Sequence, residues 1–538
     1  MRHDALASLG TMTFDVVVIG AGMTGCGVAL DAASRGLRVA LIDGSDIAAG
    51  TSSKSSKMVH GGLRYLQQRE FRLVYENLRE RQRLLENAPF LIRPLPFLIP
   101  LFGNNGVASK ALIKGYSTAL WLYDLTGGWR IGQRHRRISR AQVLELLPTL
   151  NADSLAVGFL YLDARGDDAR VALTLARTAA LDFDVVVANY VRATDITHDQ
   201  SGRVSSVEVR DELGGATLSV MTNFVVNATG VWADDVFKMA EHSSQHMIRP
   251  AKGVHISVPR ARLPAEVAAV LNVPGDRRSI FVVPFEDAPF TFIGTTDTPY
   301  DGDLDHPECT LEDVNYLLGA VNAAMSSSLS VNDVTGVWAG LRPLLTPREG
   351  HAIRERTADL SRRHQVTDSR DGVIHITGGK WTTYRQMAED TVDAMRPYLK
   401  DLGRARTKHL RLHGTGEWRP HSPLETHLYR RYGEDAVVIL NLIAKDQTLS
   451  EVAIAGQSYV YAEFLYAVHH EMATSLIDLL TRRTRAHLHD ARSTLEAAPT
   501  IASLVAHEIG WSAIERDRQV STYRDLVEHE LRAAGVAL

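Results

Sequence analysis

The chain has 538 residues, a length that predicts two or three domains rather than a single core. Hydrophobic residues make up 45% and charged residues 23%, which excludes a disordered or fibrous protein. The 59 basic residues against 63 acidic ones give a net charge of −4, so no nucleic-acid partner is expected.

Cysteine content and hydropathy indicate the cellular compartment of the protein. The two cysteines, Cys26 and Cys309, lie far apart and cannot build a disulfide framework, which indicates a reducing environment. The first dozen residues lack the apolar segment of a signal peptide. No run of about 18 apolar residues occurs, so no membrane-spanning helix is predicted. We expect an intracellular protein that is soluble or bound to a membrane surface.

Residues 14–43, FDVVVIGAGMTGCGVALDAASRGLRVALID, predict a βαβ unit. The apolar run VVVI is typical of a parallel strand buried on both faces. In the G-x-G-x-x-G that follows, Gly20 permits the tight turn, Gly22 lets a pyrophosphate approach the backbone, and Gly25 lets helix and strand pack closely. The second strand ends at Asp43, whose carboxylate can accept ribose hydroxyls.

The whole βαβ arrangement favours a dinucleotide site over a structural unit with a glycine-rich turn, although it does not separate NAD from FAD. The next segment, TSSKSSKMVHGGLRYL, covers residues 51–66. It continues from the strand that ends at Asp43, so it should face the ligand rather than form a solvated loop. Its hydroxyls and lysine suit a pyrophosphate and a ribose, and His60 with two glycines suits close approach to a flat ring.

The next predicted elements are an amphipathic helix, an apolar segment and a basic run. Residues 70–90 have helical periodicity. The apolar segment 89–102 contains too many prolines for a helix. Residues 130–140 carry five arginines and no acid. Such a run is usually a solvated surface, but beside an exposed apolar segment it can also dock on anionic lipid, and both interpretations stay open.

Two predicted strands, 184–196 and 204–212, lead to the segment 224–235. This segment combines a buried strand, a turn of small residues from Ala228 to Gly230, and a helix start. Flavoproteins often carry such a turn as a second contact to the dinucleotide, although a plain strand-to-helix turn has the same pattern.

The second half of the chain predicts three further units. Residues 246–345 alternate β-like runs with loops and predict an antiparallel substrate domain. Residues 372–395 return to strand, glycine turn and helix, as a last segment that rejoins the nucleotide domain. From about residue 401 the pattern is helical. The predicted fold class is α/β plus α, with a Rossmann-like domain, an antiparallel β domain and a C-terminal helical cap.

Five segments together resemble the bacterial, aerobic type of FAD-dependent glycerol-3-phosphate dehydrogenase, within the D-amino-acid-oxidase-like flavoproteins. They are VIGAGMTGCGVALDAASRGL, TSSKSSKMVHGGLRYL, VVNATGVWADD, AGLRPL and GGKWTTYRQMAED. The resemblance runs from about residue 13 to the end. The second segment is the most specific, because amino-acid oxidases of the group lack it. The resemblance implies noncovalent FAD, oxidation of sn-glycerol 3-phosphate to dihydroxyacetone phosphate by hydride transfer from C2 to flavin N5, and electrons passed to a membrane quinone.

The resemblance also implies how the domains and the whole protein are placed. The FAD-binding domain is expected at 13–105, 161–245 and 346–400, a helical and basic insertion facing the membrane at 106–160, the substrate sheet at 246–345, and the cap at 401–538. The protein would be cytoplasmic and bound peripherally to the inner face of the cell membrane. A homodimer is left open, and no metal is expected.

The cofactor contacts implied by the resemblance come from every part of that FAD-binding domain. They are Gly20, Gly22, Gly25, Asp43, Thr51, Ser52, Ser55, Ser56, Lys57, His60, Gly61, Val191, Gly230, Gly379, Lys380 and Thr382. Val191 would use its backbone on the adenine. Asp43 stands where many members have Glu, and the shorter side chain is still an acceptor. No D-x-[DN]-x-[DN]-G loop occurs, which disfavours the calcium-regulated mitochondrial form.

By the same resemblance, Arg64, Tyr65, His255, Arg342 and Lys380 would surround the substrate. A phosphate needs cations, and a guanidinium offers two parallel donors in a fixed fork. Arg64 and Arg342 are distant in sequence, so their meeting in one pocket would define a site. Lys380 would bind phosphate or lie near flavin N1–C2=O, where positive charge stabilises the reduced anion. A surface ion pair is the alternative for each cation.

The predicted catalytic residues are His60, His255, Arg342 and Lys380. Hydride transfer leaves a hydroxyl proton that needs a base, and a histidine pKa of about 6.5 suits this role. His60 is expected near the flavin ring and His255 as a substrate ligand or the alternative base. The sequence does not separate these two roles.

Three other functions are kept as alternatives. The first is a glycerol-3-phosphate oxidase that reduces oxygen, disfavoured because the central insertion typical of such proteins is not found. The second is an amino-acid or sarcosine-type oxidase, disfavoured by HGGLRYL and the long helical cap. The third is a non-catalytic FAD-binding scaffold.

Overall fold

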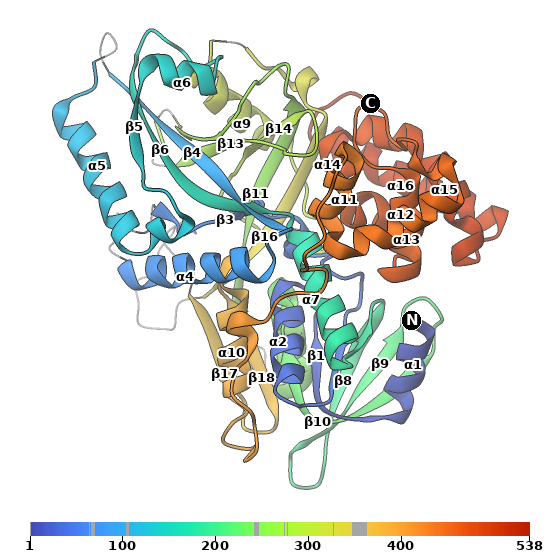
Figure 1. Ribbon diagram of the computed structural model, residues 1–538. Coiled ribbons are helices and arrows are strands. Elements are labelled where there is room, and N and C mark those ends of the chain that lie inside the picture. The colour runs from blue at the N-terminus through green and yellow to red at the C-terminus, as the bar shows by residue number, and fades with distance from the viewer. Residues whose placement is uncertain are drawn as a thin grey trace.

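The computed structural model describes residues 2–63, 65, 70–103, 107–241, 247–273, 275–276, 278–326, 328–346 and 363–538. Two sheets and a group of C-terminal helices make up the molecule (Figure 1). Within these ranges no helix is long and apolar enough to cross a lipid bilayer.

The first sheet contains the predicted βαβ unit. Its strands are β17 (His364–Asp368), β18 (Val373–Gly378), β10 (Thr217–Asn227), β1 (Thr13–Ile19), β2 (Val39–Ile42) and β7 (Val186–Ala188), in that order, with β8 (Val191–His198) and β9 (Val204–Asp211) continuing from β10. The strands β18, β10, β1, β2 and β7 are parallel. The strand predicted at 204–212 is β9, and the one predicted at 184–196 is divided into β7 and β8. The strands that were expected to open the segments 224–235 and 372–395 are the end of β10 and β18, so all of them belong to this sheet.

Helices cover both faces of the first sheet. One face packs against α2 (Met23–Ser34), α7 (Asp168–Phe183) and α10 (Tyr384–Asp393), and the other lies near α1 (Arg2–Thr11) and α8 (Ala233–Glu241). Val16 and Val18 of β1 belong to the core on the side of α2, α7 and α10, and Val17 belongs to the core on the side of α1 and α8. Alternate residues of a strand point to opposite faces, so a strand buried on both sides must be apolar throughout, as VVVI is.

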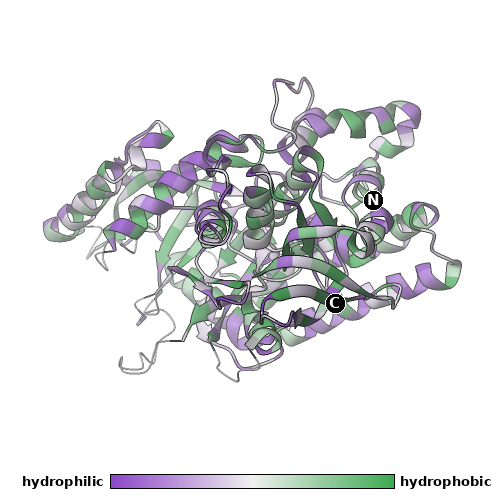
Figure 2. Cartoon of the chain, turned by 90° about the horizontal axis from the view of Figure 1, so that it is seen from below, coloured by the Kyte–Doolittle hydropathy of each residue, from purple (hydrophilic) through white to green (hydrophobic). Residues whose placement is uncertain are grey.

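The second sheet follows the order β15 (Thr298–Pro299), β11 (Ile248–Pro259), β14 (Phe290–Gly294), β13 (Ser279–Pro284), β12 (Ala268–Asn272), β4 (Ile92–Phe102), β6 (Leu155–Gly166) and β3 (Met58–Val59). In addition, β16 (Gly336–Leu345) pairs with β11, and β5 (Arg136–Ser139) pairs with β6. The helices α4 (Phe71–Asn87), α5 (Lys110–Leu125), α6 (Arg140–Leu146) and α9 (Leu311–Ala324) accompany it. Figure 2 shows the apolar residues concentrated in the inner strands and mixed with polar ones along outer helices.

This sheet differs from the predicted antiparallel domain at 246–345. Strands from the first half of the chain, β3 to β6, join it, and β4 pairs with β12 in parallel. The proline-rich segment 89–102 is largely the strand β4, and Leu95, Phe97 and Leu98 are buried. On the β12 side, β4 is paired only at Phe97 and Leu98, so most of its length lacks a second neighbour there, and such strands tolerate proline. The segment is core, not an exposed apolar surface.

The C-terminal region is helical, as predicted. It contains α11 (Pro423–Tyr432), α12 (Ala436–Lys445), α13 (Tyr461–His470), α14 (Ala486–His489), α15 (Ala491–Ile509) and α16 (Ala513–Ala533). The segment Asp478–Arg483, a turn of π-helix, ties this cap to the first sheet. There Arg482 and Arg483 both donate to the buried carboxylate of Asp46, three residues beyond Asp43.

Candidate active site

A cavity of about 1400 Å³ lies between the first sheet, the second sheet and the cap. The carboxyl ends of β1, β2 and β10 open into it from one side, which is where open α/β sheets bind ligands. Strands β11 and β16 close it from the other. Most of the predicted site residues line this one cavity: Gly20, Gly22, Asp43, Thr51, Ser52, Ser55, Ser56, His60, Tyr65, Gly230, His255, Arg342, Gly379, Lys380 and Thr382.

The glycine turn has the geometry that a pyrophosphate requires. Gly20 has a positive φ of +103°, and a Cβ there would lie 2.7 Å from the Ala228 carbonyl oxygen. A Cβ on Gly25 would lie 1.8 Å from the Gly20 oxygen, so only glycine lets α2 pack this closely against the turn. Gly22 is the N-cap of α2 and offers no side-chain oxygen, which leaves the positive end of the helix facing the cavity.

Asp43 ends β2 at the cavity wall. Its two oxygens accept the N–H groups of Ala21 at 2.7 Å and Ser45 at 2.8 Å. Burial raises the pKa of this carboxyl, and the two backbone hydrogen bonds partly offset that rise. Each oxygen retains a second lone pair, so a ribose hydroxyl can still donate to it.

Three predicted cofactor residues, Gly25, Gly61 and Val191, do not line the cavity, and Lys57 is a fourth. Gly25 packs on the turn as described, and Gly61 is buried, with its N–H donated to the Tyr123 hydroxyl at 3.0 Å. Val191 is core, and its N–H donates to the Asp43 carbonyl, while its neighbours Tyr190 and Arg192 line the cavity. Arg64 lies outside the described residues.

Lys57 also differs from the prediction, because its side chain points away from the cavity. Its φ is +55°, and its Nζ donates to the Ser53 and Ser55 carbonyls and to Asp168 Oδ1, each at 3.4 Å. The neighbouring Ser56 and Met58 face the cavity instead. One side of the hydroxyl-rich segment, residues 51–66, therefore faces the cavity, and Lys57 lies on its other side.

His255 is held in a stacked pair on the far side of the cavity. The register of β11 and β16 places it opposite Trp338, and the two rings stack with centroids 4.8 Å apart. Ser56 Oγ lies 2.7 Å from His255 Nε2. Burial, and then the positive charges of Lys57 and Arg342, lower the pKa of His255 well below its ordinary value of 6.5. The ring is therefore neutral at neutral pH.

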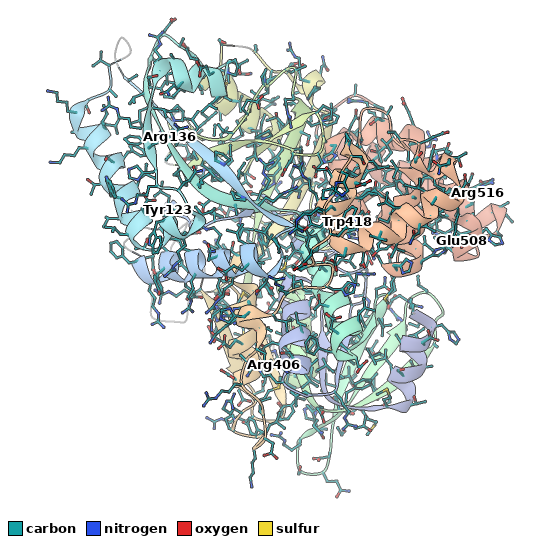
Figure 3. All side chains as sticks on the ribbon, in the orientation of Figure 1. Tyr123, Arg136, Arg406, Trp418, Glu508 and Arg516 are labelled. Carbon is teal, nitrogen blue, oxygen red and sulfur yellow. The ribbon has the colours of Figure 1, made fainter. Side chains whose placement is uncertain are left out.

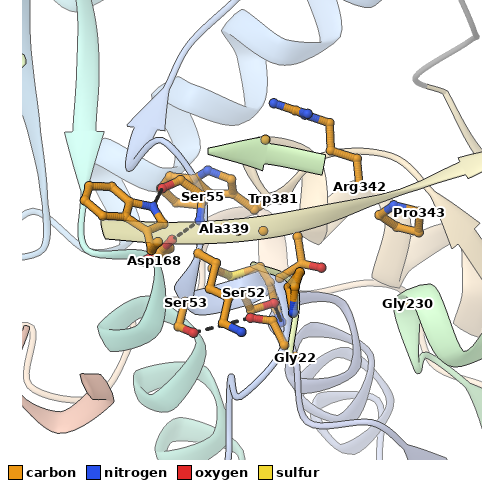
Figure 4. Close-up of a pocket in the computed structure, with 18 of the residues that line it drawn as sticks. Gly22, Ser52, Ser53, Ser55, Asp168, Gly230, Ala339, Arg342, Pro343 and Trp381 are labelled. Carbon is orange, nitrogen blue, oxygen red and sulfur yellow. Dashed lines mark hydrogen bonds between the residues drawn. The ribbon is translucent and has the colours of Figure 1, made fainter. Parts of the chain in front are cut away.

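Arg342 lies close to this histidine. Its guanidinium covers Gly253, where a Cβ would be 2.4 Å from Nη2, and donates to Thr295 Oγ1 and to the Thr296 carbonyl at 3.2 Å each. Asp297 Oδ1 lies 3.5 Å from Nη1. Figure 4 shows Arg342 on β16 and, across the pocket, Gly22, Ser52 and Ser53.

Lys380 and Tyr65 complete the wall at this end. Lys380 Nζ stands 3.8 Å from the centroid of the Tyr65 ring, which is a cation–π distance. Both residues line the cavity, with His60. The two segments that supply them are more than 300 positions apart in the sequence.

Sequence reasoning missed Trp338, Thr295 and Asp297. Trp338 precedes Arg342 by four residues on one strand, so the period of two puts both on one face, and that signal was available. Thr295 and Asp297 follow β14 directly, but only the fold brings them to Arg342.

The fold and the cavity define a class of protein. A glycine turn with a helix N-terminus and a ribose acceptor at one end fits the pyrophosphate and adenosine of FAD. A neutral histidine, an arginine and a lysine at the other end fit an anionic substrate that loses a hydride and a proton. Such an arrangement is typical of a flavin-dependent oxidoreductase.

The chain belongs to the FAD dependent oxidoreductase family, which it matches over residues 15–385. Residues 374–516 match the C-terminal domain of alpha-glycerophosphate oxidase. The chain is 39% identical to glycerol-3-phosphate dehydrogenase 2 of Mycobacterium tuberculosis, covering 98% of this chain and 91% of that protein. It is 35% identical to the mitochondrial glycerol-3-phosphate dehydrogenase of Homo sapiens, covering 97% of this chain and 74% of that protein.

Solved structures agree with this assignment. The glycerol-3-phosphate dehydrogenase from Bacillus halodurans, complexed with FAD, superimposes with a TM-score of 0.80 and 28% identity over 98% of this chain and 97% of that one. The L-alpha-glycerophosphate oxidase from Mycoplasma pneumoniae, at 17% identity and a TM-score of 0.56, shares the fold over 77% of this chain.

Proposed function

We propose that the protein oxidises sn-glycerol 3-phosphate to dihydroxyacetone phosphate with FAD bound in the large cavity. The observation that carries this proposal is the placement of Arg342 next to His255 in a cavity that begins at the glycine turn. The relatives named above support it, because they are glycerol-3-phosphate dehydrogenases.

The roles of the residues follow from charge and position. FAD, when bound, supplies the acceptor at N5 for the hydride that leaves C2. Arg342 presents its guanidinium to the phosphate, with Lys380 as the second cation, and thereby orients the carbon chain. A neutral histidine, His255 or His60, takes the proton of the C2 hydroxyl as the C–H bond breaks. Ser56 keeps the His255 ring in one orientation through its hydrogen bond.

Anaerobic mixing of the holoenzyme with glycerol 3-phosphate tests this function. The yellow flavin absorbance should fade within a single turnover, and glycerol at the same concentration should cause far slower fading because it lacks the anionic group. Fading with an amino acid instead would favour the amino-acid oxidase alternative. Stable absorbance with every polyol phosphate and amino acid would favour the non-catalytic scaffold.

For the electron acceptor we propose a quinone taken from the membrane. One part of the cavity wall is apolar, formed by Met58, Leu63, Phe97, Ile99, Tyr116 and Tyr161. Tyr116 belongs to α5, which also exposes large apolar residues. With the flanking segments they form what we call the α5 patch: Val107, Leu112, Trp121, Leu122, Leu125 and Trp129. The buried strand β4 cannot serve as the apolar docking surface, and the α5 patch takes that role in the proposal.

The arginine run lies beside the α5 patch. Arg134, Arg136 and Arg137 are exposed, and the Arg134 guanidinium lies 5.8 Å from the centroid of the Trp121 ring. Basic residues near an anionic leaflet contribute about 1 kcal/mol each. Figure 3 shows Arg136 and Tyr123 on the side of the molecule opposite Glu508 and Arg516 of the cap. We therefore propose attachment to the inner face of the cell membrane through this side.

Vesicle flotation measures that attachment. The double variant Trp121→Ser with Leu125→Ser should lower the bound fraction on anionic vesicles roughly tenfold or more, because each side chain contributes about 1 kcal/mol or more of apolar burial. The variant Arg134→Glu with Arg136→Glu and Arg137→Glu should also lose binding, and more so at low salt. As a matched control, Leu181→Ser with Leu213→Ser changes two side chains that are each 53% exposed elsewhere. Equal flotation of all four proteins would contradict the proposal.

Oxygen is the alternative acceptor. If the reduced holoenzyme consumed oxygen as fast as it is reduced by substrate, without quinone or dye, the oxidase function would replace the one proposed. A homodimer is a further proposal, which sedimentation of the holoenzyme tests directly.

A further inference from the structure

A second cavity, of about 90 Å³, lies behind the hydroxyl-rich segment. Lys57 lines it, whereas the neighbouring Ser56 and Met58 line the large cavity, so this segment separates the two. The other walls come from strands β4 and β6, from the start of α7, and from α11 and α14 of the cap. The second cavity is thus located where the helix α7, the second sheet and the cap meet.

Cations dominate the lining of the second cavity. Among the described residues, seven positive side chains line it: Lys57, Arg93, Arg165, Arg170, Arg430, Arg431 and Arg485. Three acids share the lining: Asp167, Glu286 and Asp287. Behind the lining, Asp168, Glu463 and Glu471 pair with Lys57, Arg431 and Arg170. Even with these three included, cations outnumber carboxylates.

Several of the guanidinium groups have donors to spare. The Nε atoms of Arg170, Arg431 and Arg485 are buried and have no hydrogen-bond partner within the described ranges. These side chains are 3%, 7% and 3% exposed. Carboxylate oxygens stand 3.6 Å from Arg431 Nε and from Arg485 Nε, too far for a hydrogen bond. An unsatisfied buried donor destabilises the fold, and a ligand rich in acceptors can offset this cost.

The neighbouring histidine is uncharged. His489 lines the second cavity, and burial, with Arg431 and Arg485, lowers its pKa to about 3. The imidazole therefore stays neutral, and its single N–H is donated from Nδ1 to Gln457 Oε1 at 3.0 Å, so it adds neither charge nor a donor for an anion. No group in this cavity is needed for the reaction proposed above.

We propose that the second cavity binds a small free oxyanion, of the class of inorganic phosphate. Its volume of about 90 Å³ suits a small tetrahedral oxyanion better than a larger phosphate ester. The acceptors of such an ion would meet donors from all three parts of the molecule. The ion would therefore join the cap to α7 and to the second sheet.

The second cavity also lies close to the active site, and Lys57, Trp338 and His255 connect the two. Lys57 Nζ lies 4.9 Å from the centroid of the Trp338 ring, and the same ring stacks on His255. An anion bound next to Lys57 is thus separated from the substrate end of the large cavity by one lysine and one indole. This proximity makes the flavin environment a reporter of binding.

Calorimetric titration of the holoenzyme with inorganic phosphate tests the proposal. Phosphate can also enter the substrate site, so the titration is made in Arg342→Gln holoenzyme, where that site is weakened. We expect saturable binding there, a rise in the thermal unfolding temperature, and no competition by glycerol 3-phosphate. Sulfate should replace phosphate, and acetate should bind more weakly because it offers fewer acceptors.

Two further sets of substitutions should change the affinity for phosphate in opposite directions. Arg430 and Arg93 pair with Glu286 at 3.1 and 2.9 Å. Arg93→Gln with Arg430→Gln should weaken phosphate binding at least tenfold, whereas Glu286→Gln should tighten it, because a competing carboxylate is removed. Neither change should alter single-turnover flavin bleaching. Absence of saturable heat in the Arg342→Gln protein, or equal affinity in all variants, would show that the second cavity holds only water and would overturn the proposal without touching the proposed function.

Discussion

Replacing Arg342 with glutamine is expected to lower kcat/KM for glycerol 3-phosphate roughly 100- to 1000-fold. A hydrogen bond to a charged group contributes about 1.5–3 kcal/mol, and a guanidinium can offer two to one phosphate. Thr295 and Thr296 hold the guanidinium in place, so glutamine cannot reproduce its fork. The phosphate is present in substrate and transition state alike, so most of the loss should appear in KM. Steady-state kinetics with a soluble dye as acceptor measures both constants.

The matched control for Arg342 is Arg262, whose guanidinium pairs with Asp333 and is 51% exposed. Arg262→Gln should leave kcat and KM unchanged. The slow reaction with glycerol should be equal in the wild type and in Arg342→Gln, because glycerol has no phosphate to bind. A drop in kcat with unchanged KM would contradict the binding role and place the arginine at the reacting carbon instead.

Single-turnover flavin bleaching should separate the two candidate bases. The variant that lacks the base should be slower by about 10²- to 10⁴-fold, the range that a positioned general base contributes. His255→Asn retains a side chain that can hydrogen-bond Ser56, so loss of positioning alone should cost less. The comparison variant is His60→Asn. Wild-type rates in both proteins would show that neither histidine is the base.

The pH dependence of bleaching gives a second criterion for His255. Its pKa is lowered by burial, by Lys57 and by Arg342, so the ring stays neutral as the pH falls through 6.5. If His255 is the base, the wild-type rate should hold below pH 6.5 and decline only in more acid solution. A decline centred near pH 6.5 would instead indicate a base with an unperturbed pKa.

Local sequence patterns predicted much of the architecture. The run VVVI, the three glycines of the turn and the terminal Asp43 each satisfy a requirement within one βαβ unit of 30 residues. The amphipathic helix expected at 70–90 is α4, and the helical cap expected from about residue 401 has its first α-helix at Pro423. These features are predictable because backbone conformation and two-sided burial are imposed by near neighbours.

The errors arose where distant segments decide the outcome. The prolines of 89–102 argued against a helix correctly, but nothing local shows that this segment pairs with β6 and becomes core. Lys57 was expected to face the cofactor, and its positive φ and the carboxylate of Asp168 turn it away. The segment 106–160 was expected to face the membrane, but the apolar residues of the α5 patch were not identified, because which face of a helix remains uncovered depends on what packs against the other face.

The sequence by itself determined that this protein binds a dinucleotide, since a glycine at Gly25 is needed wherever helix and turn approach so closely. It also provided the cations and histidines from which a substrate site can be made. Only the tertiary structure decided which of them meet: the β11–β16 register sets His255 against Trp338, and three separate parts of the chain enclose the second cavity. Contacts between residues hundreds of positions apart depend on the packing of whole sheets, and no local pattern encodes that packing.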